Sequence, residues 1–524
     1  MTTTATGASG AASQAATATS GTTPAGAASS SESAQRGVST LRNRHVTMIA
    51  LGGIVGSALF IGSGNVIRSI GPAAILSYLL GGLLVYLAMK MLGEMAAARP
   101  SVGSFMDYAR DGLGPFASYL VGWLYWYFWV GVLAYDAVIG GETLHGWFPA
   151  IPAWAGSLAV IALVIVANAV SVRGFGETEF WLASVKVVAV FVFLGAGTLY
   201  VLGLWPGAGF SVPNLWEHGG FAPNGYTVAL SGMAVVIFAY FGTEIAVMAA
   251  AESEDPGPSV RRATNTVIWR ILLFFIGSIT LIAAIVPWNQ LPDPTDVATA
   301  PFTYVLHLFG VPGAAQIMGL VIFTAVLSVL NSGLYSASRM LSAMGAQGFA
   351  PPVLARRNAR GVPVPAIFAS ILGALFAVGF RFVFPETPIF EFIMNSSGLV
   401  ALVVYAMIAC THFAYRRRMS REEVRALEFR TRFFPLTNLL VAVGVAVVFV
   451  IMIADPGSQV QVWTSLVAIA FAVAAWPIAR GHVRRREAAQ AEAAESADAA
   501  AVEEAEAAQA EPARPAGGEK PAVG

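Results

Sequence analysis

The chain has little of what soluble and secreted proteins depend on. Only one of its 524 residues is a cysteine, Cys410, so a disulfide framework and a cysteine-based metal site are both excluded. Charged residues make up 11% of the chain, whereas soluble domains carry about 25%. The 30 basic and 30 acidic residues cancel, which argues against nucleic acid as a partner. This composition predicts a protein of the lipid bilayer.

Motifs for catalysis and nucleotide binding are absent as well. The sequence contains no His-Glu-x-x-His zinc motif, no Gly-x-Ser-x-Gly nucleophile elbow and no Gly-x-x-x-x-Gly-Lys-Ser/Thr phosphate loop. We therefore expect no enzyme, no cofactor and no bound metal ion. Any transport against a gradient has to draw on an ion gradient rather than on ATP.

Long apolar stretches dominate what is present. Twelve of them approach or exceed the roughly 20 residues that a membrane-spanning helix needs. We expect an all-α membrane protein with 12 transmembrane helices, built from residues 41–482. The predicted spans are residues 46–66, 73–97, 118–141, 152–171, 180–204, 226–250, 267–287, 314–343, 364–384, 391–414, 433–453 and 459–479.

The segments outside the spans indicate an orientation. Residues 1–40 are mostly Ala, Ser, Thr and Gly, and residues 483–524 carry a run of Ala and Glu, so we expect two disordered tails, the second acidic. An even number of spans places both tails on one side, and the positive-inside rule makes that side the cytoplasm, at the inner (plasma) membrane. The opposite loops hold only Arg68 and Arg381. The arginines assigned to cytoplasmic loops are Arg99, Arg110, Arg173, Arg261, Arg262, Arg270, Arg356, Arg357, Arg360 and those at 416–432.

Glycines interrupt two of the spans. The first contains four glycines within residues 52–62, and the sixth contains Gly242 beside Glu244. Unwound backbone persists in hydrocarbon only where it lines a cavity or holds a ligand, and a pair of such breaks marks the substrate site of many transporters. Close packing between helices is the alternative explanation. Phe238 and Phe241 beside the second break are candidate gates, with ordinary packing as the alternative.

Three ionisable residues inside spans are candidates for function. Lys186 lies in the fifth span, where inserting a lysine costs about 2.5–3.5 kcal/mol, unless it snorkels to the cytoplasmic surface. Glu244 either caps backbone amides freed by the second break or contacts the substrate. Asp136 in the third span either lines an outer vestibule or marks the end of its helix.

Short motifs in a fixed order carry a family resemblance. They include Gly-Glu-Thr-Glu-Phe-Trp at 176–181 and Asn-Ser-Gly-Leu-Tyr-Ser-Ala-Ser-Arg-Met at 331–340. The others lie at residues 41–46, 49–53, 70–72, 93–95, 250–253 and 262–265. Together they resemble bacterial amino-acid permeases of the amino acid–polyamine–organocation superfamily, from about Arg42 to Trp476. Residues 122–129, 251–253 and 266–270 are most similar to γ-aminobutyrate permeases.

The resemblance implies a fold and a carboxylate site. The fold is the LeuT fold, in which five helices are repeated with inverted topology (5+5) and two more follow. The substrate's carboxylate is then bound by the first break, at Ile54, Val55, Gly56, Ser57 and Ala58. Relatives that take α-amino acids usually have Gly-Ser-Gly or Gly-Thr-Gly there, and the methyl group of Ala58 is compatible with a γ-amino acid.

The resemblance also implies roles for residues outside the first break. Phe238 aligns with an aromatic side chain that covers the substrate, and Lys186 with a lysine that replaces a sodium ion. The eighth-span residues Ser328 and Asn331 lie where sodium-driven relatives hold a cation. Asp136 falls where relatives commonly carry glutamate.

These observations predict a function and leave alternatives. We expect a proton-coupled symporter that imports a small amino acid, namely γ-aminobutyrate, across the plasma membrane. Its partners are then the amino acid, the proton and the lipid bilayer. The alternatives are an exchanger, a permease for α-amino acids and, from another class, a membrane receptor that senses an amino acid.

Overall fold

The structure, a computed structural model, consists of helices and their connections. It describes residues 41–486 apart from residues 54, 102–103, 171, 295–296, 384–388 and 428, together with residues 488 and 496. Over this part of the chain no strand is formed, and the only β-pairs are two isolated bridges. The prediction of an all-α protein is therefore confirmed for the described residues.

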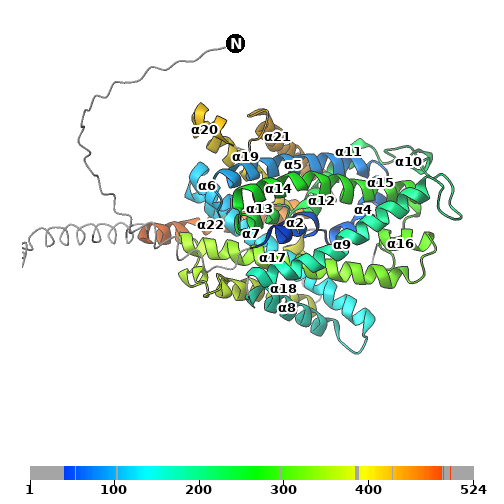
Figure 1. The fold of residues 1–524 in the computed structure, drawn as a ribbon, viewed down its shortest axis with the longest axis horizontal. Helices are drawn as coiled ribbons and strands as arrows, with labels where there is room; N and C mark the ends of the chain where they lie inside the picture. The colour runs from blue at the N-terminus through cyan, green and yellow to red at the C-terminus, as the bar shows by residue number, and fades with distance from the viewer. Residues whose placement is uncertain are drawn as a thin grey trace, which may run out of the picture. The chain divides into compact units, whose positions relative to one another are not determined.

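About half of the described helices are long, and in Figure 1 these run across the view in roughly one direction, as spans of a membrane protein do. The long helices are α5 (Ala74–Ala98), α7 (Pro115–Trp147), α8 (Ala153–Val170), α9 (Val172–Val201), α14 (Pro256–Arg270), α17 (Ala314–Gln347), α18 (Val364–Val383), α19 (Ile389–Arg418), α21 (Leu436–Ala454) and α22 (Gln459–Ala474). The shorter ones are α2 (Asn43–Gly52), α3 (Ser57–Phe60), α4 (Gly62–Ile70), α6 (Phe105–Leu113), α10 (Asn214–Glu217), α11 (Tyr226–Ser231), α12 (Met233–Tyr240), α13 (Ile245–Ala251), α15 (Ser278–Ile285), α16 (Pro301–Leu308) and α20 (Arg421–Ala426). A π-helix at Ile271–Gly277 joins α14 to α15, and 3-10 turns lie at Trp288–Gln290 and Pro352–Ala355.

The number of membrane crossings agrees with the prediction within one or two. In the described residues, ten helices are long and apolar enough to cross a membrane, and the bent pair formed by Asn43–Phe60 and Gly62–Ile70 raises this to eleven. A shorter apolar helix lies at Ala153–Ala169, where the fourth span is predicted. Twelve crossings and the inverted repeat remain predictions.

Both predicted breaks are present. In the first span, helix ends at Gly52 and resumes at Ser57. A bend of 60° follows at Ile61, between the segments Asn43–Phe60 and Gly62–Ile70. In the sixth span, α12 ends at Tyr240, α13 begins at Ile245, and Gly242 between them has φ +97°. Side chains other than glycine rarely tolerate that φ, which explains why glycine stands there.

Two helix boundaries differ from the prediction. The helix of the seventh span begins at Pro256 instead of residue 267, because the polar stretch after the proline forms the first turns of α14. As a result, Arg270 lies inside the helix rather than in a loop. At the other end of the chain, the last helix continues to Arg486, beyond the predicted end of the twelfth span at residue 479.

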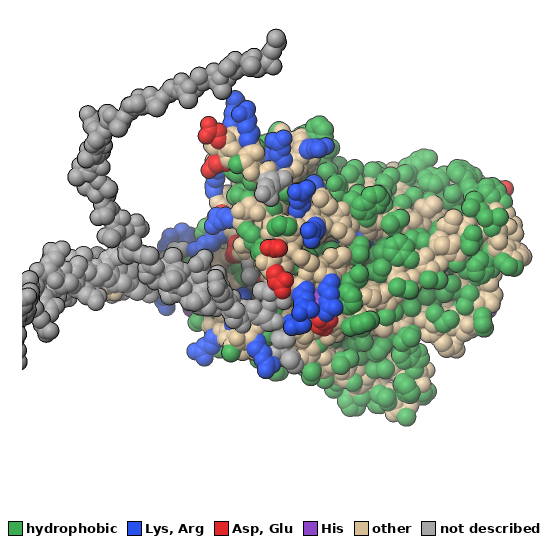
Figure 2. Space-filling view, in the orientation of Figure 1, with side chains coloured by type: hydrophobic (Ala, Val, Ile, Leu, Met, Phe, Trp, Pro, Cys, Tyr) green, Lys and Arg blue, Asp and Glu red, His purple; other side chains and the backbone are tan. Residues whose placement is uncertain are grey.

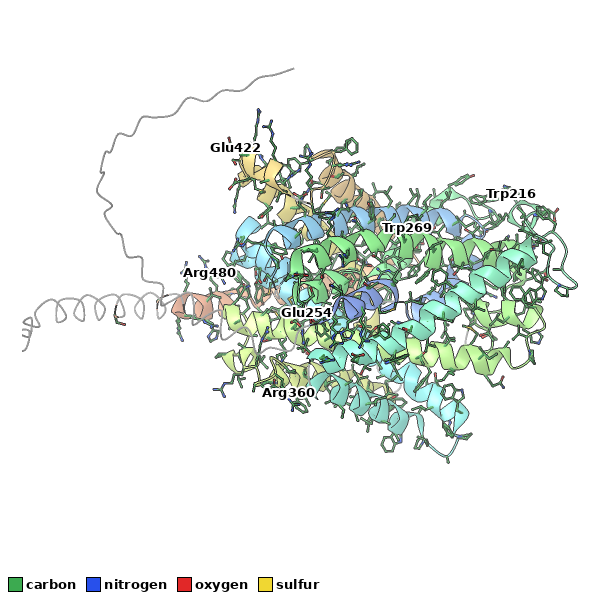
Figure 3. All side chains as sticks on the ribbon, in the orientation of Figure 1. Trp216, Glu254, Trp269, Arg360, Glu422 and Arg480 are labelled. Atoms are coloured by element: carbon green, nitrogen blue, oxygen red, sulfur yellow. The ribbon has the colours of Figure 1, made fainter. Side chains whose placement is uncertain are left out.

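Charge is concentrated at one end of the helical bundle. In Figure 2 the Lys and Arg side chains gather where α6, α20 and the last helix lie, and hydrophobic side chains cover most of the remaining visible surface. Figure 3 places Arg360, Glu422 and Arg480 toward that end and Trp216 at the other. This asymmetry is the feature on which the predicted orientation rests.

The helices α7 and α8 approach each other closely at a glycine, which yields a prediction about stability. A methyl group on Gly141 would meet the Ala153 carbonyl and lie 2.6 Å from the backbone nitrogen of Ser157. Gly141→Ala should therefore lower the thermal midpoint of unfolding in detergent, because overpacking costs about 1–3 kcal/mol. Gly146→Ala on the same helix meets no atom within 4 Å and is the control. Equal midpoints for the two variants would contradict this packing.

Candidate functional site

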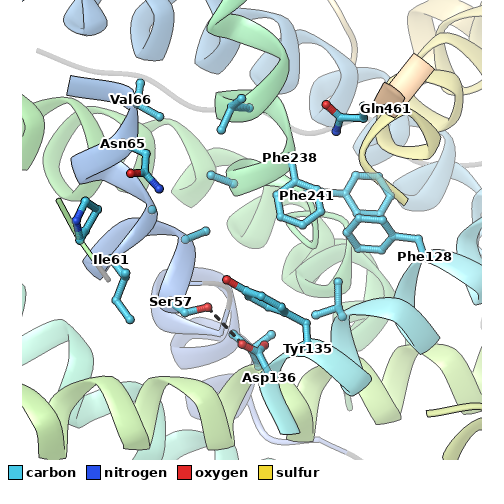
Figure 4. Close-up of a pocket in the computed structure, with 18 of the residues that line it drawn as sticks. Ser57, Ile61, Asn65, Val66, Phe128, Tyr135, Asp136, Phe238, Phe241 and Gln461 are labelled. Carbon is cyan, nitrogen blue, oxygen red and sulfur yellow. Dashed lines mark hydrogen bonds between the residues drawn. The ribbon is translucent and has the colours of Figure 1, made fainter. Parts of the chain in front are cut away.

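A cavity of about 340 Å³ lies between the two broken spans (Figure 4). Its walls come mainly from the first break with α4, from the middle of α7, and from the end of α12 with the turn that follows. The lining residues are Gly56, Ser57, Ala58, Ile61, Gly62, Asn65, Val66, Tyr78, Phe128, Trp129, Val132, Tyr135, Asp136, Val235, Phe238, Ala239, Phe241, Pro294, Val329 and Gln461.

The cavity brings together six residues that were predicted as site residues, namely Gly56, Ser57, Ala58, Asp136, Phe238 and Phe241. The other predicted residues are buried in the bundle and do not line the cavity. These are Val55, Gly242 and Glu244 near the breaks, and Lys186, Ser328 and Asn331 farther away. Ile54 lies outside the described residues.

Polar groups gather at the first break. The Ser57 hydroxyl donates a hydrogen bond to Oδ1 of Asp136 over 3.1 Å, as Figure 4 shows. The backbone N–H groups of Gly56 and Ser57 have no hydrogen-bond acceptor among the described residues. Asp136 is 2% exposed and lies well inside α7, so it does not mark the end of its helix. Free N–H groups on a cavity wall form a site for an anionic group.

Aromatic rings form the opposite wall. The ring centroid of Phe128 lies 4.2 Å from that of Phe241 and 5.6 Å from that of Phe238. Tyr405 of α19 supports Phe241 from behind, with the centroids 5.4 Å apart. This wall offers apolar contact to the carbon chain of a ligand whose charged group is bound at the first break.

The second break is held by two buried charged side chains. Oε2 of Glu244 accepts the N–H of Gly242 over 3.0 Å, which is the capping role that was one of its two predicted alternatives. The prediction that Arg270 lies in a cytoplasmic loop is wrong: its guanidinium donates to the Ala50 carbonyl over 3.0 Å and to the Thr243 hydroxyl over 2.5 Å. One side chain thus joins the unwound ends of the first and sixth spans. A charged residue within the apolar run of the predicted seventh span was the signal that could have identified Arg270 as a buried side chain.

Lys186 belongs to a separate buried network. Its Nζ donates to the Ser328 hydroxyl over 2.8 Å, and that hydroxyl donates in turn to Glu179. The side-chain amide of Asn331 donates to the other oxygen of Glu179 over 3.1 Å. Lys186 and Glu179 have no exposed surface, so Lys186 does not snorkel. Glu179 was missed as a site residue, although it lies in the motif at 176–181.

Another ion pair lies at the far end of α13. Nε of Arg339 on α17 is 3.1 Å from Oε1 of Glu252, and the hydroxyl of Tyr335 donates to the same carboxylate over 2.7 Å. The Arg339 guanidinium also stacks over the Tyr335 ring at 3.7 Å. These contacts tie the end of the sixth span to the eighth.

Comparison with known proteins identifies the family. A family model described as amino acid permease matches residues 45–484. The chain belongs to the amino acid permease family. The permease is therefore a membrane transporter for amino acids rather than an enzyme, and the prediction from its motifs is confirmed.

Individual relatives cover most of the permease. It is 43% identical over 415 residues to the γ-aminobutyric acid permease of Bacillus subtilis, covering 79% of this chain and 87% of that one. It is 41% identical to the γ-aminobutyric acid permease of Escherichia coli K12, covering 82% and 91%. It is 37% identical to the aromatic amino acid transport protein AroP of Salmonella typhimurium, covering 82% and 93%.

A solved structure supports the fold. The permease matches a histidine-to-alanine mutant of the Eremococcus coleocola manganese transporter with a TM-score of 0.52 at 14% identity, covering 85% of this chain and 95% of that one. Its structural neighbours are thus transporters with a LeuT-like fold. At this identity the similarity concerns the fold alone.

The contacts of Arg270 yield a prediction for a double-mutant cycle. Arg270→Met removes the buried cation that donates to Ala50 and Thr243, together with the opposite charge that acts on the carboxylate of Glu244, and a buried charge left without compensation is costly. Adding Glu244→Gln removes the leftover charge and keeps an oxygen that can accept the Gly242 N–H. We therefore expect the double variant to melt at a higher temperature than Arg270→Met alone, measured by thermal unfolding in detergent. Arg262→Met, an exposed change on the same helix, is the control. A double variant no more stable than Arg270→Met would refute the pairing.

Proposed function

We propose that this permease imports γ-aminobutyrate together with protons. The observation that supports this most directly is the cavity at the first break, which combines N–H groups that have no partner among the described residues with an aromatic wall. The relatives in Bacillus subtilis and Escherichia coli carry the name of γ-aminobutyric acid permease, which supports the same substrate. The aromatic amino acid relative supports a second candidate, a permease for α-amino acids with large side chains.

The two ends of the substrate have separate partners in this proposal. The N–H groups of Gly56 and Ser57 bind the carboxylate, because a helix start carries a partial positive charge. The carbonyl of Ala239, which accepts no hydrogen bond from a described residue, binds the ammonium group at the end of α12. The methyl group of Ala58 narrows the space next to the carboxylate and favours an amine set several carbons away. Phe238 covers the carbon chain between the two ends.

This proposal makes a prediction about specificity. In uptake by cells or proteoliposomes, γ-aminobutyrate should compete at concentrations at least about tenfold lower than alanine, leucine or phenylalanine, a difference of 1.4 kcal/mol in binding. Gly56→Val places a branched side chain at the carboxylate site and should abolish uptake without preventing membrane insertion. Stronger competition by phenylalanine would favour the α-amino-acid candidate. Normal uptake by Gly56→Val would show that the carboxylate is not bound at the first break.

The orientation in the membrane is part of the proposal. In this proposal the arginine-rich end of the bundle in Figure 2 faces the cytoplasm, in accordance with the positive-inside rule. An even number of spans then leaves both chain termini on the cytoplasmic side of the inner membrane. Asn65 of α4 and Gln461 at the start of α22 line the cavity. Each lies in the half of its span that is farther from the arginine-rich end. Substrate then enters from outside, while the contacts of Arg339 with Glu252 close the cytoplasmic side.

Proton coupling rests on Lys186 and its network. The cost of burying a charged lysine is offset by Glu179, and the hydroxyl of Ser328 joins the two groups. A side-chain carbon on Gly53 would lie 3.4 Å from Oε1 of Glu179, so the network packs directly against the first break. A movement of the first span therefore changes the surroundings of both charges, and with them the preference for the protonated form. The ammonium group of Lys186 takes the place of a metal cation, so transport does not require sodium.

The coupling proposal is tested with empty and preloaded proteoliposomes. An inward pH gradient should drive accumulation into empty vesicles in the absence of sodium, whereas an exchanger would need internal substrate. Lys186→Ala and Glu179→Gln should both lose this accumulation and retain substrate binding. Glu177→Gln, two residues from Glu179 but paired with Arg44 outside the network, should behave like the wild type. A strict need for sodium, or undiminished pH-driven uptake by Lys186→Ala, would overturn the proposal.

A further inference from the structure

A second cavity, of about 790 Å³, lies beside the basic residues at the end of the last helix. It is formed by the start of α7, by the turn after α17 and by the last turns of the final helix, which ends at Arg486. None of its lining residues belongs to the cavity between the broken spans. It therefore has no part in the proposed substrate site.

One wall of this second cavity is apolar and aromatic. Tyr119, Phe349 and Ile478 line it, and the neighbouring Trp476 packs against Tyr119 with the ring centroids 5.1 Å apart. Trp123 lines it too, and the indole N–H of this residue is buried without a hydrogen-bond partner among the described residues. Because this nitrogen has almost no accessible surface, it does not face the open cavity, and Trp123 contributes its ring to the apolar wall.

The rim of the second cavity is basic. His482, Arg485 and Arg486 line it, and none of the three forms an ion pair with another described residue. Arg486 donates to the carbonyl of Gly345 over 2.8 Å, which holds its guanidinium at the end of α17. Arg480 and Arg484 lie on the same helical stretch, so five of the seven residues from 480 to 486 are Arg or His.

We propose that the second cavity binds an anionic glycerophospholipid of the cytoplasmic leaflet. The phosphate contacts Arg485, Arg486 and His482, and an acyl chain follows the apolar wall. Clusters of basic residues directly cytoplasmic of a spanning helix attract anionic lipids in general. An acidic peptide could pair with the basic rim but would leave the apolar wall uncovered. The acyl chain of a lipid covers that wall, so the wall favours a lipid as the ligand. The inference rests on the proposed orientation and is independent of the proposed substrate.

The lipid joins three parts of the bundle that are far apart in sequence. Its partners belong to α7, to the end of α17 and to the last helix. Asp136 lies on α7, and Ser328 lies on α17. Binding should therefore stabilise the scaffold around the substrate site and raise the thermal midpoint of unfolding.

The test titrates delipidated, full-length protein with phosphatidylglycerol or phosphatidylcholine and follows bound lipid by native mass spectrometry, with thermal unfolding as a second readout. We expect preferential binding of phosphatidylglycerol by the wild type. Because one basic residue near an anionic headgroup is worth roughly fivefold in affinity, Arg485→Gln should weaken it about fivefold and Arg485→Gln/Arg486→Gln about 30-fold. Arg485→Gln alone keeps the contact of Arg486 with Gly345, so its result does not depend on that contact.

The control variant Arg421→Gln/Arg425→Gln removes the same charge from α20, whose residues do not line the second cavity, and should bind phosphatidylglycerol like the wild type. Equal binding of the two lipids, or equal loss in both double variants, would overturn the proposal. Inorganic phosphate provides the last comparison: stabilisation by phosphate as strong as that by phosphatidylglycerol would assign the site to a free anion instead.

Discussion

The permease depends on one constraint, which is that hydrocarbon offers no hydrogen-bond partner to a peptide group released from a helix. Every unwound residue at the two breaks therefore needs a partner from the protein or from a ligand. Glu244 supplies one for the N–H of Gly242, and Arg270 supplies one for the carbonyl of Ala50. On the cavity side, the N–H groups of Gly56 and Ser57 have no such partner among the described residues. The protein thus supports the backbone behind the cavity, and these two N–H groups on its wall are left without a partner among the described residues.

Buried charges follow from the same constraint. A helix break that must stay open in an apolar bundle is most simply held by charged side chains, since these make stronger hydrogen bonds than neutral ones. Each such charge then needs a counterpart, because an uncompensated buried charge is costly. Arg270 lies near Glu244, and Lys186 is joined to Glu179 through Ser328. The second set packs against Gly53 at the first break, so the structure links the backbone of this break to a group of buried ionisable side chains.

Much of the fold was predictable from local pattern. A membrane span is recognisable in the sequence as a run of about 20 apolar residues. The described helices overlap all twelve predicted ranges. The breaks were predictable because glycine is the residue that tolerates a φ such as the +97° of Gly242. Prediction failed where a polar stretch continues a helix: residues 256–266 look like a loop, yet they form the first turns of α14 and carry Arg270 into the bundle.

By itself, the sequence determined the membrane class, the family and the position of the two breaks, since each of these is encoded in neighbouring residues. Only the tertiary structure decided which ionisable side chains meet. Lys186 and Ser328 are 142 residues apart, and Arg270 reaches a carbonyl 220 residues before it. Glu179 and Glu177 are two residues apart in one motif, but the first is buried against α17 and the second pairs with Arg44 near the surface. No periodicity distinguishes them, because the face that a helix turns toward its neighbours is set by the packing of the whole bundle.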